Sequence, residues 1–572
     1  MTDVQIESPV DQALEDLTEG EKAWAKTSLA DRLRLLADTR QRVIDNAHQW
    51  VQAAAFQIKK LDPESPLVGE EWISGPYAVA GAIASLIASL EQLQAGQSPL
   101  QDAEFGVTPG GRTTVSVLPL NIFDKLLLSG FSAELWLQPG VDKAEALRTA
   151  GLAQRDPSRT QGVGAVLGAG NITSIAPLDT LYELFANNRV VALKLNPITD
   201  PLLPVFTQVL QPFIAIGAVR ILTGGADVGT YLVHHQLVDH VHMTGSSVTH
   251  DAIVFGTGEE GAQRKAANQP VLDKAITSEL GGVSPTIVVP GQWNSSDIEF
   301  QTRHIATQRL HNNGYNCIAS QVVVLSKAWP QRQEFLAALR KAVDEAPSRP
   351  AYYPGSDDRV AGAQQSYPDA ERLGQNGARV LVVDPEDRTA LLRTEYFGPV
   401  LGVIELDVAN DPDGALFLQE AARVANDEFV GTLGVNVLAH PDTIKALGSH
   451  FDTLVEDLRY GTVAINAWTG VGYLTPSATW GAFPGHVLND VQSGIGVVHN
   501  GFLVEKPERT VVRGPFRPFP RSFAHGEWAL SPKPPWFVSN ATAAGTGELL
   551  VDFAGKPSLL KVPRIFISAL RG

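Results

Sequence analysis

The sequence predicts an α/β fold built on a doubly wound, mostly parallel sheet. Between residues 162 and 246, short apolar strand patterns alternate four times with helical patterns. Glycine-bearing turns at 168–171, 223–225 and 244–246 each follow one of these strands. Parallel strands need helical crossovers, and such sheets bind ligands where the carboxyl ends of their strands meet. We therefore expect these three turns to line one binding edge.

Length and composition indicate a soluble protein of two or three domains. The 572 residues are too many for one core, and 44% hydrophobic and 19% charged residues are ordinary for a globular chain. A net charge of −17 disfavours nucleic acid and anionic membrane as partners. A single cysteine excludes an internal disulfide, and the acidic N-terminus does not resemble a signal peptide. We expect a cytoplasmic protein.

Residues 1–60 are predicted to be helical. An apolar stripe that includes Leu36, Val43 and Trp50 predicts a long helix, with Asp31 as its cap. A second helix is expected over 75–93; its apolar run, 77–90, is too short to span a bilayer.

Residues 113–140 predict two strands, 113–118 and 133–137, around an apolar segment at 121–128. Two interpretations stay open: a hairpin that pairs with another subunit, or a surface hairpin of the same chain.

The two α/β blocks are predicted in detail. In the first, strands are expected at 163–167, 190–195, 219–222 and 238–243, and helices at 177–187, 202–216 and 226–235. The second begins near 281, with strands at 286–289, 322–325, 380–383, 402–406, 433–438 and 462–465 and helices at 331–345 and 413–426. The tail, 505–572, is rich in Pro, Arg and aromatic residues and is expected to be an extended arm, with disorder as the alternative.

Cys317 is the only cysteine, and it lies where a loop of small and amide residues leads into an apolar strand. A lone cysteine is usually a small buried hydrophobe. A nucleophilic thiol also needs a base, a group for the oxyanion and a redox partner. Glu279, followed by two glycines, could be the base, and Asn171, after a glycine-rich turn, could point its amide into the cleft. Each could also be an ordinary surface or turn residue.

Two other motifs are weak. The turn at 168–170 lacks the full G-x-G-x-x-G pattern of dinucleotide binding. His240 and His242 would share a strand face, but carboxylate and cysteine partners are lacking nearby in the sequence, so we expect structural histidines and no metal site.

Taken in order, seven segments resemble the aldehyde dehydrogenase superfamily, over roughly residues 20–500. They are 168–171, 191–194, 222–225, 238–246, 279–282, 313–317 and 395–400. The resemblance implies that Cys317 attacks an aldehyde, that Asn171 and the Cys317 backbone N–H hold the oxyanion, and that Glu279 activates the water that hydrolyses the thioester. It also implies NAD or NADP as cofactor, contacted by Lys194, Gly225, Gly245, Ser246, Leu280, Glu395 and Phe397.

The resemblance further implies a domain plan and an assembly. An NAD(P)-binding domain would comprise 1–112 and 141–278, with an oligomerisation hairpin at 113–140. A catalytic domain would span 279–485, and 486–572 would form an oligomerisation strand and the extended arm. The substrate would be a small-molecule aldehyde, and the protein a homodimer or homotetramer.

Several positions depart from the family pattern. Pro197 replaces a frequent Glu that holds ribose hydroxyls in NAD-preferring members, so we favour NADP over NAD. Gly170 replaces an aromatic residue, which should widen or reshape the pocket; residues 479–482 and a polar insert at 257–268 also differ. Two alternatives remain: a CoA-dependent acyl reductase or acylating aldehyde dehydrogenase, which would not require Glu279, and a non-catalytic scaffold on the same fold.

Overall fold

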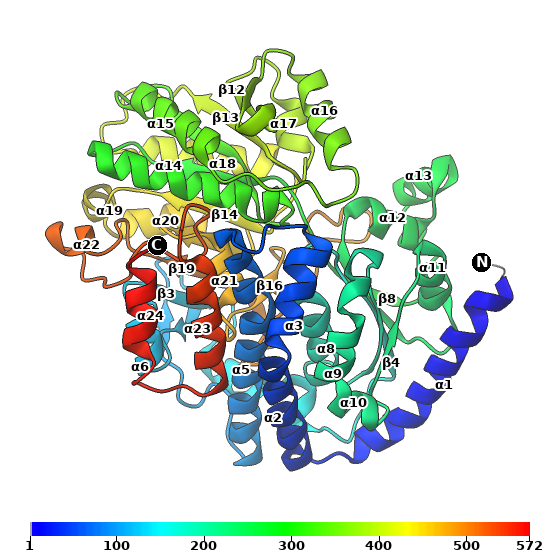
Figure 1. The fold of residues 1–572 in the computed structure, drawn as a ribbon. Coiled ribbons are helices and arrows are strands. Elements are labelled where there is room, and N and C mark those ends of the chain that lie inside the picture. The colour runs from blue at the N-terminus through cyan, green and yellow to red at the C-terminus, as the bar shows by residue number, and fades with distance from the viewer. Residues whose placement is uncertain (1–2) are drawn as a thin grey trace.

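A computed structural model of the chain describes residues 3–572, with side chains from Pro9 onward. It contains a six-stranded sheet, an eleven-stranded sheet and helices packed around both (Figure 1). The mixed α/β architecture predicted from the sequence is confirmed.

The six-stranded sheet has the order β17-β8-β7-β4-β5-β6, and every neighbouring pair is parallel except β17 with β8. Its strands are β4 (Val163–Leu167), β5 (Val190–Lys194), β6 (Val219–Leu222), β7 (His240–Gly245), β8 (Ala275–Leu280) and β17 (Gly494–Ile495). The four strands expected in the first block are thus confirmed. β4 and β5 are short, buried and mainly aliphatic runs, whereas β7 alternates two buried histidines with Val241 and Met243.

The helices of this domain follow the predicted alternation. They are α7 (Lys143–Thr149), α8 (Ile175–Phe185), α9 (Leu203–Val209), α10 (Gln211–Ala215), α11 (Ala226–His234), α12 (Ser247–Phe255) and α13 (Gly258–Ala266). The insert at 257–268 is mainly α13, which projects from the domain at the right of Figure 1. The helix expected over 202–216 is broken at Leu210, where α10 begins with a proline in its first turn.

Strand β8 corrects the expected position of Glu279. The glycines after Glu279 predict a turn that opens the catalytic domain. In the structure, Glu279 instead lies on β8 of the six-stranded sheet, where it pairs with Thr244, and Leu280 pairs with Gly245. The strand is hard to detect because Thr277, Ser278 and Glu279 interrupt its apolar pattern.

The eleven-stranded sheet has the order β1-β2-β3-β19-β15-β14-β9-β10-β13-β12-β11. Its central strands are β9 (Ser284–Val288), β10 (Ser320–Ser326), β12 (Arg379–Val383), β13 (Val400–Leu406), β14 (Gly434–Leu438) and β15 (Thr462–Ile465). All six match predicted strands. On β10, Val322 and Val324 enter one core and Val323 and Leu325 enter another, as expected for a strand covered by helices on both faces.

Helices cover this sheet, and short strands complete the domain. The helices are α14 (Ser295–Leu310), α15 (Arg332–Glu345), α16 (Ser356–Ser366), α17 (Thr389–Arg393), α18 (Ala415–Glu428), α19 (Pro441–Leu447), α20 (Ser449–Glu456) and α21 (Thr469–Leu474). The short strands are β11 (Glu371–Leu373), β16 (Trp480–Gly481) and β18 (Val497–Val498).

The predicted hairpin forms within this one chain. Strands β2 (Thr113–Leu118) and β3 (Ser132–Leu137) pair with each other, β1 (Phe105–Val107) covers β2, and β19 (Pro507–Arg513) joins β3 to β15. Between β2 and β3, α6 (Ile122–Leu127) packs its apolar side chains on the C-terminal helices. The hairpin therefore leaves only the short strand β1 as an edge, which removes the unpaired-edge argument for an oligomer.

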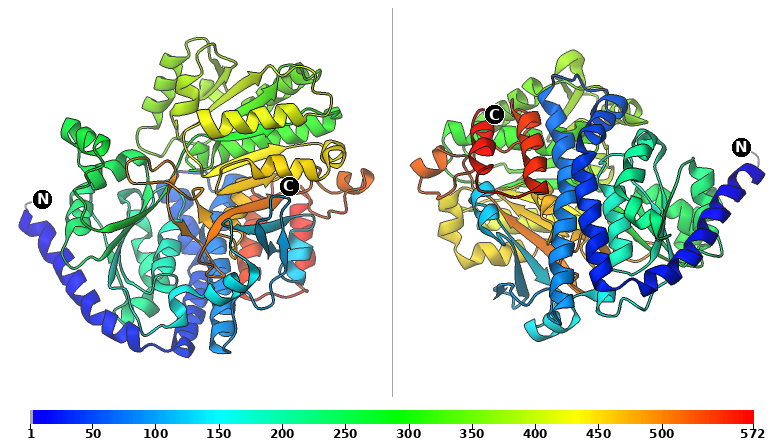
Figure 2. Two further views of the ribbon diagram at one scale, coloured as in Figure 1. Left: turned by 180° about the vertical axis from the view of Figure 1, so that it is seen from behind. Right: turned by 60° about the horizontal axis from the view of Figure 1, so that its bottom comes forward.

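The tail is not an extended arm. It contains α22 (Arg521–Ala524), α23 (Ala543–Gly555) and α24 (Val562–Ala569). Helix α23 lies beside the N-terminal helices, and α24 packs on α23 and α6 (Figure 2). Helix α23 approaches α4 (Gly69–Trp72) so closely that a Cβ on Gly69 would lie 2.4 Å from the backbone of Ala543. Apolar residues spaced three and four apart explain the helices; the proline-rich stretch hides them in the overall composition.

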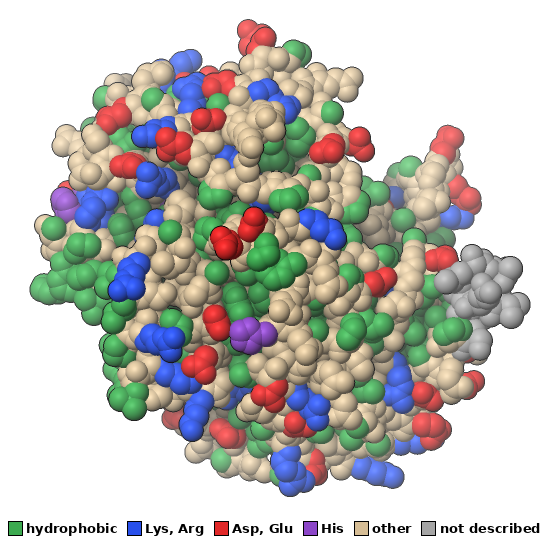
Figure 3. All heavy atoms as spheres, viewed as in Figure 1, with side chains coloured by type: hydrophobic (Ala, Val, Ile, Leu, Met, Phe, Trp, Pro, Cys, Tyr) green, Lys and Arg blue, Asp and Glu red, His purple; other side chains and the backbone are tan. Residues whose placement is uncertain are grey.

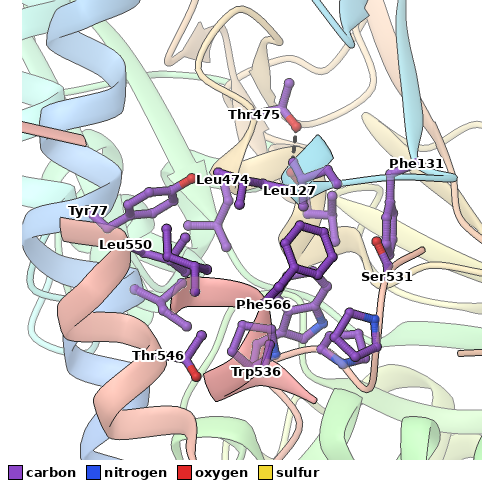
Figure 4. Close-up of a pocket in the computed structure, with 18 residues that line it drawn as sticks. Tyr77, Leu127, Phe131, Leu474, Thr475, Ser531, Trp536, Thr546, Leu550 and Phe566 are labelled. Atoms are coloured by element: carbon purple, nitrogen blue, oxygen red, sulfur yellow. Dashed lines mark hydrogen bonds between the residues drawn. The ribbon is translucent and has the colours of Figure 1, made fainter. Parts of the chain in front are cut away.

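An apolar cavity of about 80 Å³ lies between the C-terminal helices, α6 and α21 (Figure 4). Aromatic and aliphatic side chains such as Tyr77, Phe131, Trp536 and Phe566 line it. Its hydroxyls are engaged in the protein: Thr475 Oγ1, for example, donates to Val471 O.

The N-terminal segment is helical, as predicted. It consists of α1 (Asp3–Lys26), α2 (Leu29–Asp45), α3 (Ala47–Gln52) and α5 (Ala78–Gln94). The cap of α2 is Ser28 rather than Asp31: Ser28 Oγ accepts from the Asp31 N–H, so Asp31 lies in the first turn.

Helical structure is continuous over Pro66–Gln94, longer than the helix expected over 75–93. In length and hydropathy this 29-residue stretch could cross a membrane, but 61% of its most apolar window is buried inside the protein. It is kinked at Gly75, before Pro76, and it contributes Val79, Ile83 and Leu90 to the largest core.

Candidate active site

The three predicted catalytic residues meet where the two sheets adjoin. Asn171 follows β4, Glu279 ends β8, and Cys317 precedes β10. Asn171 Nδ2 donates a 2.9 Å hydrogen bond to the carbonyl of Tyr315, two residues before the cysteine, and the Cys317 thiol faces the Glu279 carboxylate. The structure thus brings together residues that are far apart in the chain.

A strained loop presents Cys317. Helix α14 gives way at 311–314 to a turn in which Asn312 and Asn313 have φ of 52° and 56°, a left-handed conformation that asparagine tolerates. Asn312 Nδ2 donates to the carbonyls of both Asn171 and Tyr315 at 3.1 Å. This side chain ties the oxyanion candidate to the cysteine loop.

Glu279 has the environment of a base that works near neutral pH. It is 3% exposed, and Trp480 Nε1 donates to its Oε1 over 3.2 Å. Burial, reinforced by the nearby Asp179 carboxylate, raises the pKa of Glu279 to about 7. It can therefore both accept and release a proton under physiological conditions.

The half-buried thiol of Cys317 is protonated at rest. Burial, followed by the charges of Glu279 and Glu395, raises the pKa of the thiol well above its ordinary value. The thiol must therefore lose its proton as it attacks, and Glu279 is the carboxylate that faces it.

The predicted cofactor residues follow the carboxyl ends of adjacent strands. Lys194 ends β5 and is 7% exposed, Gly225 caps α11, Gly245 ends β7, and Ser246 caps α12, where its Oγ accepts from the Thr249 N–H at 3.2 Å. The N-terminus of a helix is a favourable place for a phosphate. This edge therefore suits a dinucleotide.

Leu280, Glu395 and Phe397 lie on the catalytic side of that edge. Gly281 allows Glu395 to approach, because a Cβ there would lie 2.1 Å from Glu395 Oε1. This buried oxygen has no hydrogen-bond partner among the described residues, and burial raises the pKa of Glu395 to about 8. A buried oxygen free to accept suits the ribose hydroxyls of a nicotinamide nucleotide. Phe397 packs against Tyr315 and Tyr353, at centroid distances of 5.9 and 5.0 Å.

Sequence reasoning missed several residues of the site. Trp480 belongs to residues 479–482, which stand out in the sequence only as a departure from the family pattern. Asn312 is one of several small and amide residues before Cys317, and nothing in the sequence distinguishes it from the others. Asp179 carries a stronger signal: it and Glu183 are the two acidic residues of the mainly apolar helix α8, and each is 1% exposed. Carboxylates buried in a mainly apolar helix need partners.

The substrate pocket is not widened beside Gly170, although the missing aromatic side chain predicts that it could be. A Cβ on Gly170 would lie 2.8 Å from the side-chain carbon of Asn196, so the amide of Asn196 occupies that volume. Among residues 3–572, no group of three or more His, Cys, Asp or Glu side chains is placed to hold a metal ion.

Comparison with known proteins agrees with this geometry. The model of the aldehyde dehydrogenase family matches residues 152–375, which include Asn171, Glu279 and Cys317. The matched part of the chain is thus similar to the aldehyde dehydrogenase family.

Members of the superfamily that resemble this chain are distant. Coniferyl aldehyde dehydrogenase of Pseudomonas sp. strain HR199 is 25% identical over 289 residues, 47% of this chain and 56% of that protein. Aldehyde dehydrogenase LUC3 of Fusarium sp. is 24% identical over 355 residues, 57% of this chain and 66% of that protein. The matches thus span less than two thirds of these relatives' own length.

Solved structures show the same fold. The NADP-dependent glyceraldehyde-3-phosphate dehydrogenase of Bacillus halodurans C-125, complexed with NADP, has a TM-score of 0.58 at 16% identity, and the likeness covers 88% of this chain and 91% of that chain.

Proposed function

We propose that this protein oxidises an aldehyde to a carboxylic acid with NAD or NADP, through a covalent thioester on Cys317. The observation that carries the proposal is the pairing of a protonated thiol with the Glu279 carboxylate, whose pKa is raised to about 7. A base poised at neutral pH is what two successive proton abstractions require.

In the first step Glu279 takes the thiol proton while the sulfur of Cys317 attacks the aldehyde carbon. The carbonyl oxygen becomes an oxyanion, which the Asn171 amide and the Cys317 backbone N–H stabilise. The amide of Asn171 has two N–H groups and donates one to Tyr315 O, which leaves the second for the oxyanion. A single preorganised donor of this kind typically lowers the barrier by about 3 kcal/mol.

The structure fits a nicotinamide cofactor along the strand edge. Lys194 would hold the adenosine ribose, the N-terminus of α12 the pyrophosphate, and Glu395 with Phe397 the nicotinamide ribose and ring. When bound, the nicotinamide accepts the hydride that leaves the substrate carbon.

In the second step Glu279, which has by then released the thiol proton, removes a proton from water as the water oxygen bonds to the thioester carbon. The carbon–sulfur bond then breaks, its electron pair returns to Cys317, and the carboxylic acid leaves. Burial of Glu279 keeps competing solvent away from this base.

Between the two cofactors we now propose NAD, which revises the preference drawn from Pro197. The carboxylates of Asp200 and Asp227 act electrostatically on Lys194, at the position assigned to the adenosine ribose. They would repel a 2′-phosphate and could accept from ribose hydroxyls.

We further propose a cytoplasmic homo-oligomer, a dimer or a tetramer. One cysteine and no possible disulfide suit a reducing compartment. The contact would use a patch of exposed apolar residues, Phe523, Trp528 and Leu530, which are 41%, 83% and 38% exposed. Figure 3 shows hydrophobic side chains gathered at the left edge, where α22 lies in Figure 1.

The decisive test is Cys317→Ser, compared with the parent protein. We expect the variant to bind NAD, measured by fluorescence titration, but to form no NADH with any member of an aldehyde panel. Undiminished turnover would disprove the role of Cys317. Acyl-CoA formation on adding CoA to the parent protein would instead favour the acylating alternative.

A further inference from the structure

A row of buried ionisable side chains lies between helix α8 and strand β7, beside Glu279. On α8, Asp179 and Glu183 are one helical turn apart, and each is 1% exposed. On β7, His240 and His242 are two positions apart and therefore point to the same face of the sheet; they are 4% and 3% exposed. The sequence predicts no carboxylate partner for these histidines, but the fold places Asp179 and Glu183 beside them.

The members of this row contact one another in pairs. His242 Nε2 lies 3.5 Å from Asp179 Oδ2, and His240 Nδ1 lies 3.9 Å from Glu183 Oε2. Glu183 in turn pairs at 3.0 Å with Arg189, whose side chain is 15% exposed. The row thus leads from the interior to a partly exposed arginine.

Strand register connects the row to Glu279. In the parallel pair β7–β8, His242 is opposite Thr277 and Thr244 is opposite Glu279, so these side chains share one face. His242 Nδ1 lies 2.9 Å from Thr277 Oγ1, and Thr244 Oγ1 donates to Asp179 Oδ2 over 2.9 Å. The Asp179 carboxylate is accordingly next to the base, and it is the main charge that raises the pKa of Glu279.

Three atoms of the row are buried without a hydrogen-bond partner among the described residues. They are Asp179 Oδ1, His242 Nε2 and His240 Nδ1. A purely structural ion pair is expected to satisfy its polar atoms, because unpaired buried groups are costly. Three such atoms in one row, beside a base that must release a proton in every cycle, point to function.

We propose that the Asp179–His242 pair receives the proton that Glu279 takes from the thiol and must release before hydrolysis, and passes it through His240 and Glu183 towards the surface. The inference rests on the proposed hydrolysis by Glu279. Asp179 and His242 touch no reacting atom, so they are positioning and relay residues rather than catalytic ones.

The proton balance closes without any further reactant. Glu279 holds the thiol proton after the first step and must release it before it can act on water. It gives this proton to Asp179 Oδ1, His242 passes one onward, and one proton leaves at Glu183. The Glu279 carboxylate then takes a proton from water as the carbon–oxygen bond forms and returns it to the sulfur of Cys317, which keeps the electron pair of the broken carbon–sulfur bond. The thiol and the carboxylate are thus restored, and one proton leaves in each cycle.

The groups that face the pair are suited to transfer. Burial lowers the pKa of His242, but Asp179 and the more distant Glu183 and Glu279 outweigh it, and the net shift is upward. Burial lowers the pKa of His240 to about 4, so its ring is neutral near pH 7 and can accept a proton. The charge of Asp179 also acts on two further neighbours, the neutral phenol of Tyr473 and the neutral ring of His499.

The test is His242→Gln, because glutamine keeps a hydrogen-bonding amide but cannot carry a proton. We expect the first-turnover rate of NADH formation, which precedes hydrolysis, to be unchanged. The steady-state rate should fall about tenfold or more, the usual contribution of a proton-transfer group. Added imidazole should restore it.

His250→Gln is the matched control. His250 is fully buried, also has an unpartnered Nε2, and contacts its own carboxylate, Asp251, at 3.3 Å. It should leave both rates unchanged.

An unchanged steady-state rate in His242→Gln, or a loss that imidazole cannot restore, would overturn the relay. If that variant does not fold, Asp179→Asn is measured in the same way, and the same split between the two rates decides. Failure of the parent protein to form NADH at all would count against the proposed function instead, so the two failures are distinguishable.

Discussion

At the scale of single residues, Glu279 occupies a position where small electrostatic changes affect the whole cycle. Trp480 gives it one hydrogen bond, Cys317 faces it, and Asp179 opposes its ionisation. A less buried glutamate would titrate near 4.3 and would return protons to solvent easily but accept them poorly at pH 7. The environment of Glu279 moves its pKa into the working range.

The hydrolysis rate should therefore depend on pH through the pKa of Glu279. The base must be ionised, and its raised pKa keeps it protonated in mild acid. We expect the steady-state rate to rise with pH through about 7 and then to level, and to fall about tenfold per unit well below 7. Steady-state assays over this range check it, with first-turnover kinetics to identify the step. A flat profile would show that another group acts as the base.

Asp227→Asn should improve the use of NADP. Removing one exposed carboxylate near the 2′-position should raise NADP affinity about fivefold while NAD affinity stays the same or falls, as expected for one charge pair in water. Titration with both nucleotides measures it. Asp273→Asn, at a side chain that is 83% exposed, is the control. Equal effects of the two substitutions would refute a local role for Asp227.

Residue identities were predictable from sequence only where they belong to a motif. Asn171, Glu279 and Cys317 were found because ordered segments point to them, and the structure brings them together. Their chemical roles stay predictions. Asp179 and His242 could not be paired, because they are 63 positions apart in the chain and meet only through the fold.

At the scale of elements, the buried parallel strands were the easiest to predict. β4 and β6 have the predicted bounds because their apolar runs end at glycine or polar residues. β8 was missed because polar residues interrupt it, and α23 because prolines dominate its surroundings. In both cases tertiary packing decides the element, and local composition does not reveal it.

The contact between α4 and α23 depends on glycine at position 69. A Cβ there would overlap the Ala543 backbone, so Gly69→Ala should lower the free energy of unfolding by about 1–3 kcal/mol through overpacking. Urea titration of the full chain measures this.

Gly545→Ala, on α23 itself, is the matched control. A Cβ at this position would meet nothing within 4 Å, and alanine is the better helix former, so stability should rise by up to about 1 kcal/mol. If both substitutions changed the free energy of unfolding in the same way, the close contact of Gly69 with Ala543 would not be needed to position α23.

At the scale of the whole molecule, the two sheets position different parts of the candidate active site. The six-stranded sheet presents the cofactor edge and the base, and the eleven-stranded sheet presents the thiol. The chain crosses between them several times: β17 returns to pair with β8 after the catalytic domain is complete. The domain plan from sequence began the catalytic domain at Glu279, whereas the structure places Glu279 on β8 of the six-stranded sheet.

The exposed apolar patch near α22 makes the assembly testable. Phe523 and Trp528 contact each other with ring centroids 5.3 Å apart, yet both remain accessible to solvent. Because large exposed apolar patches mark interfaces, Trp528→Ser should shift the protein towards monomer in light scattering after size exclusion. Leu560→Ser, at a residue that is 91% exposed, is the comparison. An unchanged mass in Trp528→Ser would place the interface elsewhere.

The pairing of β3 with β19 has a consequence for the order in which the protein is made. Gln138, just after β3, bonds to the carbonyl of Pro507, 369 positions later. At about 5–20 residues per second, the ribosome needs roughly 20–70 s to supply that partner. During this time the nascent β2–β3 ribbon has an open strand edge, where a chaperone or a second nascent chain can pair. Translation speed through the catalytic domain should therefore influence how much of the protein reaches its native sheet.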